Sequence, residues 1–338
     1  MAYITFQPSD YFNTKLYTGN GSTNAQTGVG FQPDWLWFKN RADTYNHHVF
    51  DVVRGVNQQL QVDSNGAEST YATSMTSFDS DGFTLGANNN INYNGNNHVA
   101  WCWKAGGTGS SNSDGSISST VSANTTAGFS IVTWTGNSGS IGHGLGVKPA
   151  MIVAKSRGAT GGWYVTHKSL SAEMQDNYMF WNTNSANTTN NNIWGGEPTT
   201  STFSVGSGLI GNTTHVAYVF ASKKGFSKFG TYKGNGNADG TFVYTGFKPA
   251  FIMQKKSSGT SDWVIYDNKR SIFNVVTKEL KPNSSAAEST FDGIDILSNG
   301  FKQRSDYSYT NNSGATYIYM AFAEEPLVSS NNIVATAR

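Results

Sequence analysis

Two short segments of the sequence carry a glutamate that could serve acid–base chemistry. Glu68 lies in the segment Ala67–Tyr71, and Glu288 lies in the similar segment Ala287–Phe291. Two carboxylates on either side of a glycosidic bond are the usual machinery of glycoside hydrolysis. A third segment has Asn187 in place of the glutamate, and this near-isosteric exchange is typical of a local hydrogen-bonding element. We therefore predict a structural role for both glutamates and no enzymatic activity.

The histidines show no metal-ligating pattern. His98 and His215 hold corresponding positions that Tyr317 takes in a third segment, which predicts packing at the edge of a strand. His47 and His48 are adjacent, so their side chains point to opposite faces of a strand and are poorly placed to chelate one ion. The sequence also lacks the Gly-x-Ser-x-Gly turn of many serine hydrolases. We expect neither a metal nor an organic cofactor.

Several further motifs are typical of turns or of a packed core. Asp79–Gly82 begins like a calcium-binding loop, but Asn90 occupies the position that requires a closing glutamate. Leu297–Gly300 takes the same place in a later segment, which favours a β-turn over a bound cation. The Gly-Asn-Gly of residues 19–21 also favours a turn, because Gly and Asn tolerate a positive φ. Cys102 is the only cysteine, and we expect it to be a small buried side chain.

The elements that position these residues recur three times along the chain. Each unit of about 100 residues has a Gly-x-x-Pro step followed by an apolar run. These steps are Gly30–Pro33, Gly146–Pro149 and Gly246–Pro249. Asp51–Arg54 and Asp267–Arg270 follow in two of the units, and we predict that each Asp-Arg pair fixes a turn. The run after each proline is apolar at successive positions, which predicts a central strand covered on both faces.

Short strands separated by turn residues, with few helix signals, favour an all-β fold. We predict three related antiparallel β-sandwich-like repeats in tandem. The predicted boundaries are an N-terminal arm (1–16), repeat one (17–104), a Gly/Ser-rich linker (105–128), repeat two (129–224), repeat three (225–326) and a C-terminal tail (327–338). The aromatic side chains of the arm are expected to dock on repeat one, and the linker to be flexible or to lie on the surface.

Composition limits the kinds of partner. Only 13% of the residues are charged and the net charge is +1, with no stripe of Lys and Arg, so we expect no nucleic-acid partner. The longest apolar runs are too short for a spanning helix, so we expect no membrane insertion. The N-terminus lacks the features of a signal peptide, and a single cysteine forms no intramolecular disulfide.

Aromatic residues in the Asn-, Ser- and Gly-rich loops are the best candidates for surface contacts. Rings beside amides and hydroxyls suit both sugar faces and protein partners. The candidate contact residues are Tyr71, Tyr93, Trp181, Trp194, Tyr307 and Tyr309. The alternative, that each ring only anchors its own loop, stays open.

Long motifs across the chain resemble a family of tailed-phage virion proteins known from phages of marine bacteria. The resemblance rests on Gly28–Asp34, Ser77–Gly86, Val99–Gly107, Met320–Pro326 and Ala335–Arg338. It covers nearly the whole chain. The family is described as structural, in tail fibres or other appendages, and no catalytic residues are attached to it.

The resemblance implies a location on the virion, after synthesis in the host cytoplasm, and a role in host attachment as part of a tail fibre, spike or other appendage. Expected partners are other virion proteins and a host surface glycan or envelope protein. Phage appendages are usually symmetric homo-oligomers, so we expect a homo-oligomer such as a trimer, although three repeats could imitate a trimer within one chain. A capsid decoration protein and a glycan-depolymerising tailspike are the alternative functions.

Overall fold

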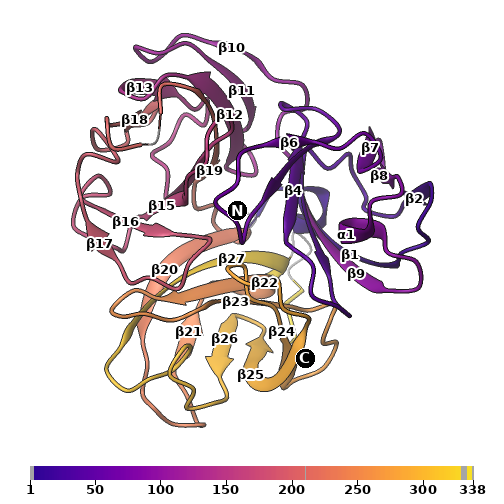
Figure 1. Ribbon diagram of the computed structural model, residues 1–338. Helices are drawn as coiled ribbons and strands as arrows, with labels where there is room; N and C mark the ends of the chain where they lie inside the picture. Colours follow the sequence, from indigo (N-terminus) through magenta and orange to yellow (C-terminus); the bar gives the residue numbers. More distant parts are fainter. Residues whose placement is uncertain (1–3, 210, 329–332, 337–338) are drawn as a thin grey trace.

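Antiparallel strands make up most of the protein. The computed structural model describes residues 4–209, 211–328 and 333–336 (Figure 1). The helices in these ranges are η1 (Pro8–Asp10), a 3-10 helix, and α1 (Asn89–Asn92). The predicted all-β fold with antiparallel, sandwich-like units is confirmed.

The strands form three modules, each built on a main sheet in which the last strand lies between an early strand and the strand that includes or follows the Gly-x-x-Pro step. The first module has the order β1 (Phe12–Thr18), β9 (Asn97–Trp103), β3 (Trp35–Asn40), β4 (His48–Asp51), β5 (Gln58–Gln61) and β6 (Ser69–Thr70). The second has β10 (Ser110–Asn112), β11 (Ser119–Asn124), β12 (Phe129–Thr135), β19 (Thr214–Phe220), β14 (Met151–Ser156), β15 (Trp163–His167), β16 (Asn177–Phe180) and β17 (Thr188–Thr189). The third has β20 (Ser227–Lys233), β27 (Thr316–Pro326), β22 (Phe247–Lys256) and β23 (Trp263–Asp267). This shared order is what related repeats would give, and the division of the sequence into repeats stays a prediction.

A smaller sheet accompanies each main sheet. These sheets are β2 (Asn24–Gln26), β8 (Gly82–Leu85) and β7 (Met75–Asp79); β13 (Gly139–Gly142) and β18 (Thr202–Val205); and β21 (Phe242–Tyr244), β26 (Gly300–Gln303), β25 (Ser289–Leu297) and β24 (Val276–Glu279). Apolar side chains of the two sheets pack together within a module, as Phe38 does with Phe83 at a ring distance of 5.1 Å.

The inner faces of the three main sheets meet in one aromatic core, around which the modules are arranged (Figure 1). Trp35 of the first module lies 4.5 Å from the Tyr218 ring of the second. Phe322 of the third module lies 5.6 Å from Trp103 and 6.1 Å from Phe220. Each module therefore buries one sheet face against the other two modules.

The strands that follow the Gly-x-x-Pro steps are covered on both faces, as predicted. In β3, Trp35 and Trp37 point into the shared core, whereas Leu36 and Phe38 point into the core of their own module. The strands β3, β14 and β22 also carry a fully buried lysine near their ends. The Nζ atoms of Lys39, Lys155 and Lys255 donate to the carbonyl of the next residue at 2.6, 2.8 and 2.7 Å, respectively.

The N-terminal arm docks on the first module and also on the third. Its last residues belong to β1, which begins at Phe12 and pairs with β9, and the Phe12 ring lies 4.9 Å from that of Trp103. The Phe6 and Tyr11 rings pack on Phe226 of the third module, at 5.6 and 6.2 Å. The arm thus bridges two modules, because the edge of β1 lies at the contact between them.

The segment 105–128, expected to be a linker that is flexible or lies on the surface, forms strands. It contains β10 and β11, and β11 pairs with β12 along its full length. The Asp34 carboxylate holds its start, accepting from the backbone N–H groups of Ala105 at 2.8 Å and Gly107 at 3.1 Å. Its Ser and Thr residues therefore extend the second module's main sheet by two strands.

Candidate functional site

The predicted aromatic contact residues do not all lie on the surface. Tyr71, Tyr93 and Tyr307 are exposed, by 47%, 38% and 37%, and Tyr309 is partly buried and stacks on Tyr307 at 5.5 Å. Tyr71 and Tyr93 belong to the first module, and Tyr307 and Tyr309 belong to the third.

Trp181 and Trp194 are buried, so the prediction that they are surface contacts is wrong. Trp181 belongs to the shared core, where its ring lies 4.8 Å from that of Trp37. Trp194 packs in the core of the second module. The polar residues around each tryptophan indicated a loop, but a loop's composition does not tell which way one large ring points.

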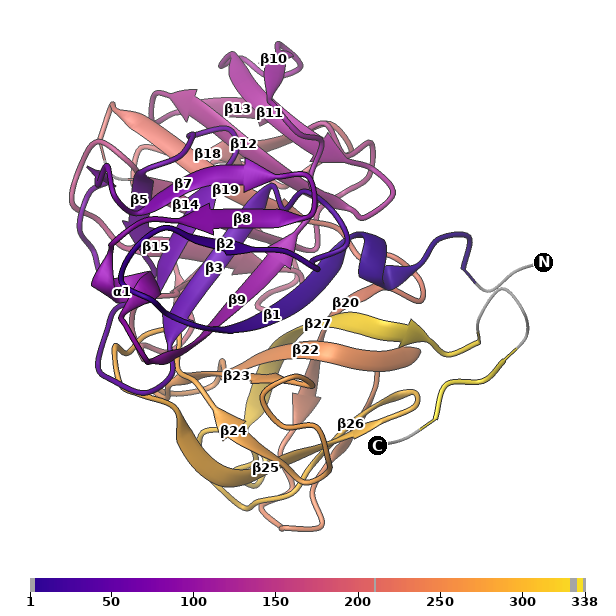
Figure 2. The ribbon, with the colours of Figure 1, turned by 90° about the vertical axis from the view of Figure 1, so that its right-hand side faces the viewer.

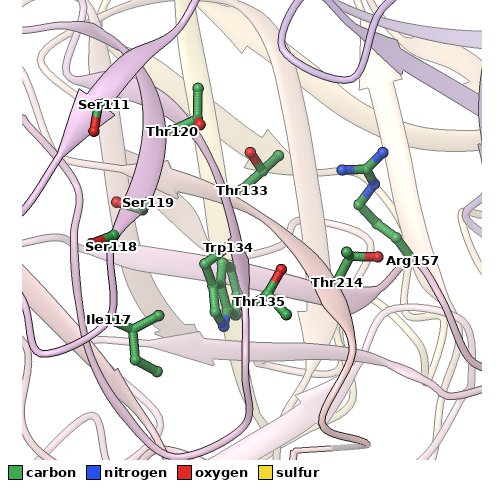
Figure 3. A pocket seen from close by; sticks show the side chains of 10 residues that line it. All are labelled: Ser111, Ile117, Ser118, Ser119, Thr120, Thr133, Trp134, Thr135, Arg157 and Thr214. Carbon is green, nitrogen blue, oxygen red and sulfur yellow. The ribbon is translucent and has the colours of Figure 1, made fainter.

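A hollow on the second module is lined mainly by hydroxyl groups (Figure 3). Its volume is about 470 Å³, and we call it the hydroxyl groove. Its hydroxyl side chains include Ser118, Ser119, Thr120, Thr133, Thr135 and Thr214. Trp134, Ile117 and Arg157 also line it.

The extra strands of the second module build this groove. Ser111 on β10 lies opposite Thr120 on β11, which lies opposite Thr133 on β12. Residues that face each other across neighbouring strands share one side of a sheet, and so do residues two apart in a strand. Thr135, two residues after Thr133, is paired with Thr214 on β19 and continues the same surface.

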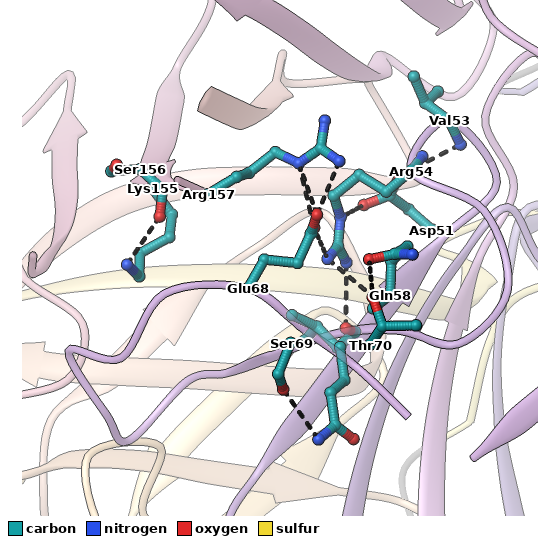
Figure 4. Close-up of polar contacts among 12 residues, drawn as sticks. Asp51, Val53, Arg54, Gln58, Glu68, Ser69, Thr70, Lys155, Ser156 and Arg157 are labelled. Carbon is teal, nitrogen blue, oxygen red and sulfur yellow. Dashed lines mark hydrogen bonds and ion pairs between the residues drawn. The ribbon is translucent and has the colours of Figure 1, made fainter. Parts of the chain in front are cut away.

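An ion-pair network holds Arg157 at the edge of the groove (Figure 4). Its Nη2 and Nε donate to the Glu68 carboxylate of the first module, at 2.7 and 3.0 Å. Glu68 also accepts from Nη1 of Arg54 at 2.9 Å. Burial by itself would raise the pKa of Glu68, but the hydrogen bonds and charges of Arg157 and Arg54 outweigh it and hold the pKa below its usual value. Nη1 of Arg157 makes no hydrogen bond to any described residue, so it remains available to a ligand.

This arrangement can bind a polyhydroxylated molecule. Hydroxyl groups donate and accept hydrogen bonds, and a guanidinium recognises oxygen atoms with a directed pair of donors. The groove's lining includes no carboxylate and no histidine among the described residues. The groove therefore offers groups for recognition and none of the usual groups for acid–base catalysis.

The two repeated glutamates connect modules, which corrects the prediction of a purely local role. Glu68 joins the first module to the second, and Glu288 joins the third to the first through Arg41 at 2.9 Å. Asn187 takes this place between the second and third modules, where its backbone N–H donates to the Ser257 carbonyl at 3.1 Å. The sequence repeats did not reveal these contacts. Each glutamate and each arginine fits a role within its own repeat, and no sequence pattern links the two residues of a pair.

The predicted packing of the histidines is confirmed. His98 stacks on Tyr17 at 5.2 Å and His215 on Trp134 at 5.1 Å, as Tyr317 does on Tyr232 at 4.9 Å. No group of three His, Cys, Asp or Glu side chains that could hold a metal ion occurs in the described ranges.

Cys102 and the predicted turns also have structural roles. Cys102 is fully buried, and burial raises the pKa of its thiol. Asp51 and Asp267 accept from the backbone N–H of Arg54 and Arg270, at 2.9 and 2.8 Å, which closes the two predicted turns. Asp79–Gly82 forms the turn between β7 and β8.

One protein-family model matches residues 7–326, a range that runs from the start of η1 to the end of β27. The family is described as a domain of unknown function, DUF7483. The chain belongs to this family. Comparisons with curated proteins and with solved structures found no match. The family match takes in all three modules.

In the part of the chain that the structure describes, no helix is both long enough and apolar enough to cross a membrane.

Proposed function

We propose that this protein is a non-enzymatic structural component of a phage virion, part of a tail fibre, spike or similar surface appendage that attaches the particle to its host. The sequence resemblance supports the virion role. The hydroxyl groove supports the attachment role, because it is a polar hollow built by two strands that have no counterpart among the described residues of the other two modules.

The ligand that fits this groove best is a glycan of the host surface. Sugar hydroxyls match the paired Ser and Thr side chains of β10, β11 and β12, and the available Nη1 of Arg157 adds a charged donor. Such a shallow polar surface binds each sugar weakly. Many copies on one particle would raise the overall affinity by multivalency.

The groove's hydroxyls provide the test. Thr133→Val with Thr135→Val removes two hydroxyls while keeping side-chain shape, and each lost hydrogen bond costs about 1 kcal/mol, so binding should weaken by roughly tenfold or more. The matched control is Thr188→Val with Thr189→Val on β17, where both residues are exposed and lie outside the groove. Binding to purified host polysaccharide is measured for both variants.

Three outcomes would contradict the proposal. Equal binding of the polysaccharide by the groove variant and the control variant would show that the groove takes no part in attachment. Shortening of the polysaccharide during incubation would make the protein a depolymerase. Density for the protein on the capsid faces in particle images would favour a decoration protein.

A further inference from the structure

A second hollowed surface lies where the second and third modules meet. Two neighbouring hollows of about 350 and 390 Å³ share Lys168, Ser222 and Lys223 in their walls. Lys228 of β20 lines the first of these hollows. We call the two together the lysine cleft. Its lysines come from the turn after β15, from the junction between modules and from β20, so the sequence does not show them as a cluster.

Three lysines of this cleft have no carboxylate partner among the described residues, whereas Lys148, which lines the second hollow, is paired with Glu197. The three are Lys168, Lys223 and Lys228. Nζ of Lys228 donates to the Tyr244 carbonyl at 2.7 Å and lies 5.1 Å from the Tyr244 ring. Partial loss of hydration lowers the pKa of both Lys168 and Lys228, and the charge of Lys168 lowers the pKa of Lys228 further. The two ammonium groups therefore repel each other, and an anion between them would relieve the repulsion.

The other two junctions between modules have no lysine at the position that corresponds to Lys168. Between the first and second modules, Val52 takes the position of Lys168, and Asp34 ties down the segment that leads into β10. Between the third and first modules this position is Asn268, in a hollow of only about 100 Å³ that Ser9 and Glu324 also line. The short junction after β19 leaves an open cleft, and lysines line that cleft.

We propose that the lysine cleft binds an anionic sugar polymer through its sulfate, phosphate or carboxylate groups. The two adjoining hollows have room for more than one charged group of a chain. Tyr244, which is 49% exposed, offers a ring for a sugar face, and Ser222 and Thr245 offer hydroxyls. Single-stranded nucleic acids usually stack on several successive rings, and here one tyrosine is the only aromatic residue in the two linings. The proposal depends neither on the hydroxyl groove nor on the virion role.

The test compares two polymers that differ in charge. Dextran sulfate should bind the intact protein, and neutral dextran of the same length should not. Lys168→Gln with Lys223→Gln should weaken dextran sulfate binding at least tenfold. The control, Lys233→Gln with Lys278→Gln, removes the same charge from two lysines that lie outside both hollows and should change binding less than twofold. Thermal unfolding of both variants should match that of the unchanged protein, because neither pair of lysines is buried.

Salt and competitors give the remaining readouts. Binding should weaken steeply as ionic strength rises, since the Debye length shortens from about 10 Å at 0.1 M to about 3 Å at 1 M. The proposal is overturned if the Lys168/Lys223 variant binds like the control, or if polyglutamate or single-stranded DNA binds as tightly as dextran sulfate. The proposal is also overturned if free sulfate, at the same concentration of sulfate groups, displaces dextran sulfate from the protein. The cleft would then bind single anions and would not select a polymer. The Thr133/Thr135 variant should keep full dextran sulfate binding, which separates this cleft from the hydroxyl groove.

Discussion

At the residue scale, equivalent places in the three modules keep a geometry while the chemistry changes. The stacked pairs Tyr17–His98, Trp134–His215 and Tyr232–Tyr317 have interplanar angles of 11°, 14° and 11°. A flat ring opposite another flat ring is therefore what the position requires. His98 stays uncharged at neutral pH, because burial lowers its pKa to about 4.

Replacing His98 should change how stability depends on pH. The unfolded chain takes up a proton at this residue near pH 6.5, whereas the folded protein does so only near pH 4. The contribution of His98 is therefore fully present above pH 6.5 and is lost as the pH falls toward 4, by about 1.4 kcal/mol per pH unit. His98→Gln removes this titration, so the gap in unfolding free energy between the two proteins should narrow as the pH falls. Urea unfolding at pH 7, 6 and 5 measures it, and a gap that stays constant would contradict the buried, neutral histidine.

At the element scale, the main sheets are joined by polar contacts that repeat around the molecule. The Tyr218 hydroxyl of β19 donates to Asp51 at the end of β4, at 2.8 Å. Nε1 of Trp101 on β9 likewise donates to Asp267 at the end of β23, at 3.0 Å. His167, at the end of β15, contacts the Tyr319 carbonyl at 3.2 Å. In each module, the last residue of one strand thus makes a polar contact with a central strand of a neighbouring module.

Arg54 is expected to be the most sensitive residue at these contacts. Its side chain is fully buried and bonds Asp51 and Glu68, so Arg54→Leu leaves two carboxylates without their partner. Breaking a buried ion pair in this way typically costs about 3–5 kcal/mol, and urea unfolding should show a loss of that size.

The second module supplies the matched control for Arg54. There His167 and Leu170 take the places of Asp51 and Arg54, and Asn187 takes that of Glu68. The triple change Asp51→His, Arg54→Leu and Glu68→Asn should therefore lose less stability than Arg54→Leu alone. A triple variant that is less stable than the single one would show that the charges themselves are needed at this junction.

The strands were the most predictable elements. β3, β14 and β22 follow from apolar residues at successive positions after each proline, because only a strand buried on both faces needs them. β10 and β11 could not be found this way, because a Ser/Thr-rich strand at the edge of a sheet resembles a linker in composition. The hydroxyl groove was not predicted for the same reason. A usable signal of a strand was the Ser or Thr at alternate positions, namely Ser118, Thr120 and Ser122.

At the scale of the whole molecule, the three modules form a closed ring. Backbone hydrogen bonds run from Glu68 to Arg157, from Asn187 to Ser257 and from Glu288 to Arg41. Each module thus contacts both others in the same sense, and together they bury one aromatic core. The lysine cleft could not be predicted from sequence, because only this ring brings Lys168 next to Lys228.

An isolated module should not fold. Residues 1–104 alone would expose Trp35, Trp37, Trp101 and Trp103 to water, and burying one large apolar side chain is worth about 1.5–3 kcal/mol. The fragment should show little tertiary structure by near-UV circular dichroism, whereas the full chain should unfold in one cooperative transition. A stable folded fragment, or three separate transitions in the full chain, would contradict the shared core.

The closed ring has a consequence for the order of the modules along the chain. Ser9 of η1 and Glu324 of β27 line one hollow, and η1 and the end of β27 lie on the same side of the molecule (Figure 2). A short connection between them would complete a continuous loop of polypeptide, which could then be opened between the first and second modules. The same three contacts would form in that circular permutant. The architecture thus depends on which modules are neighbours in space. A chain that begins with any one of the three modules would form it.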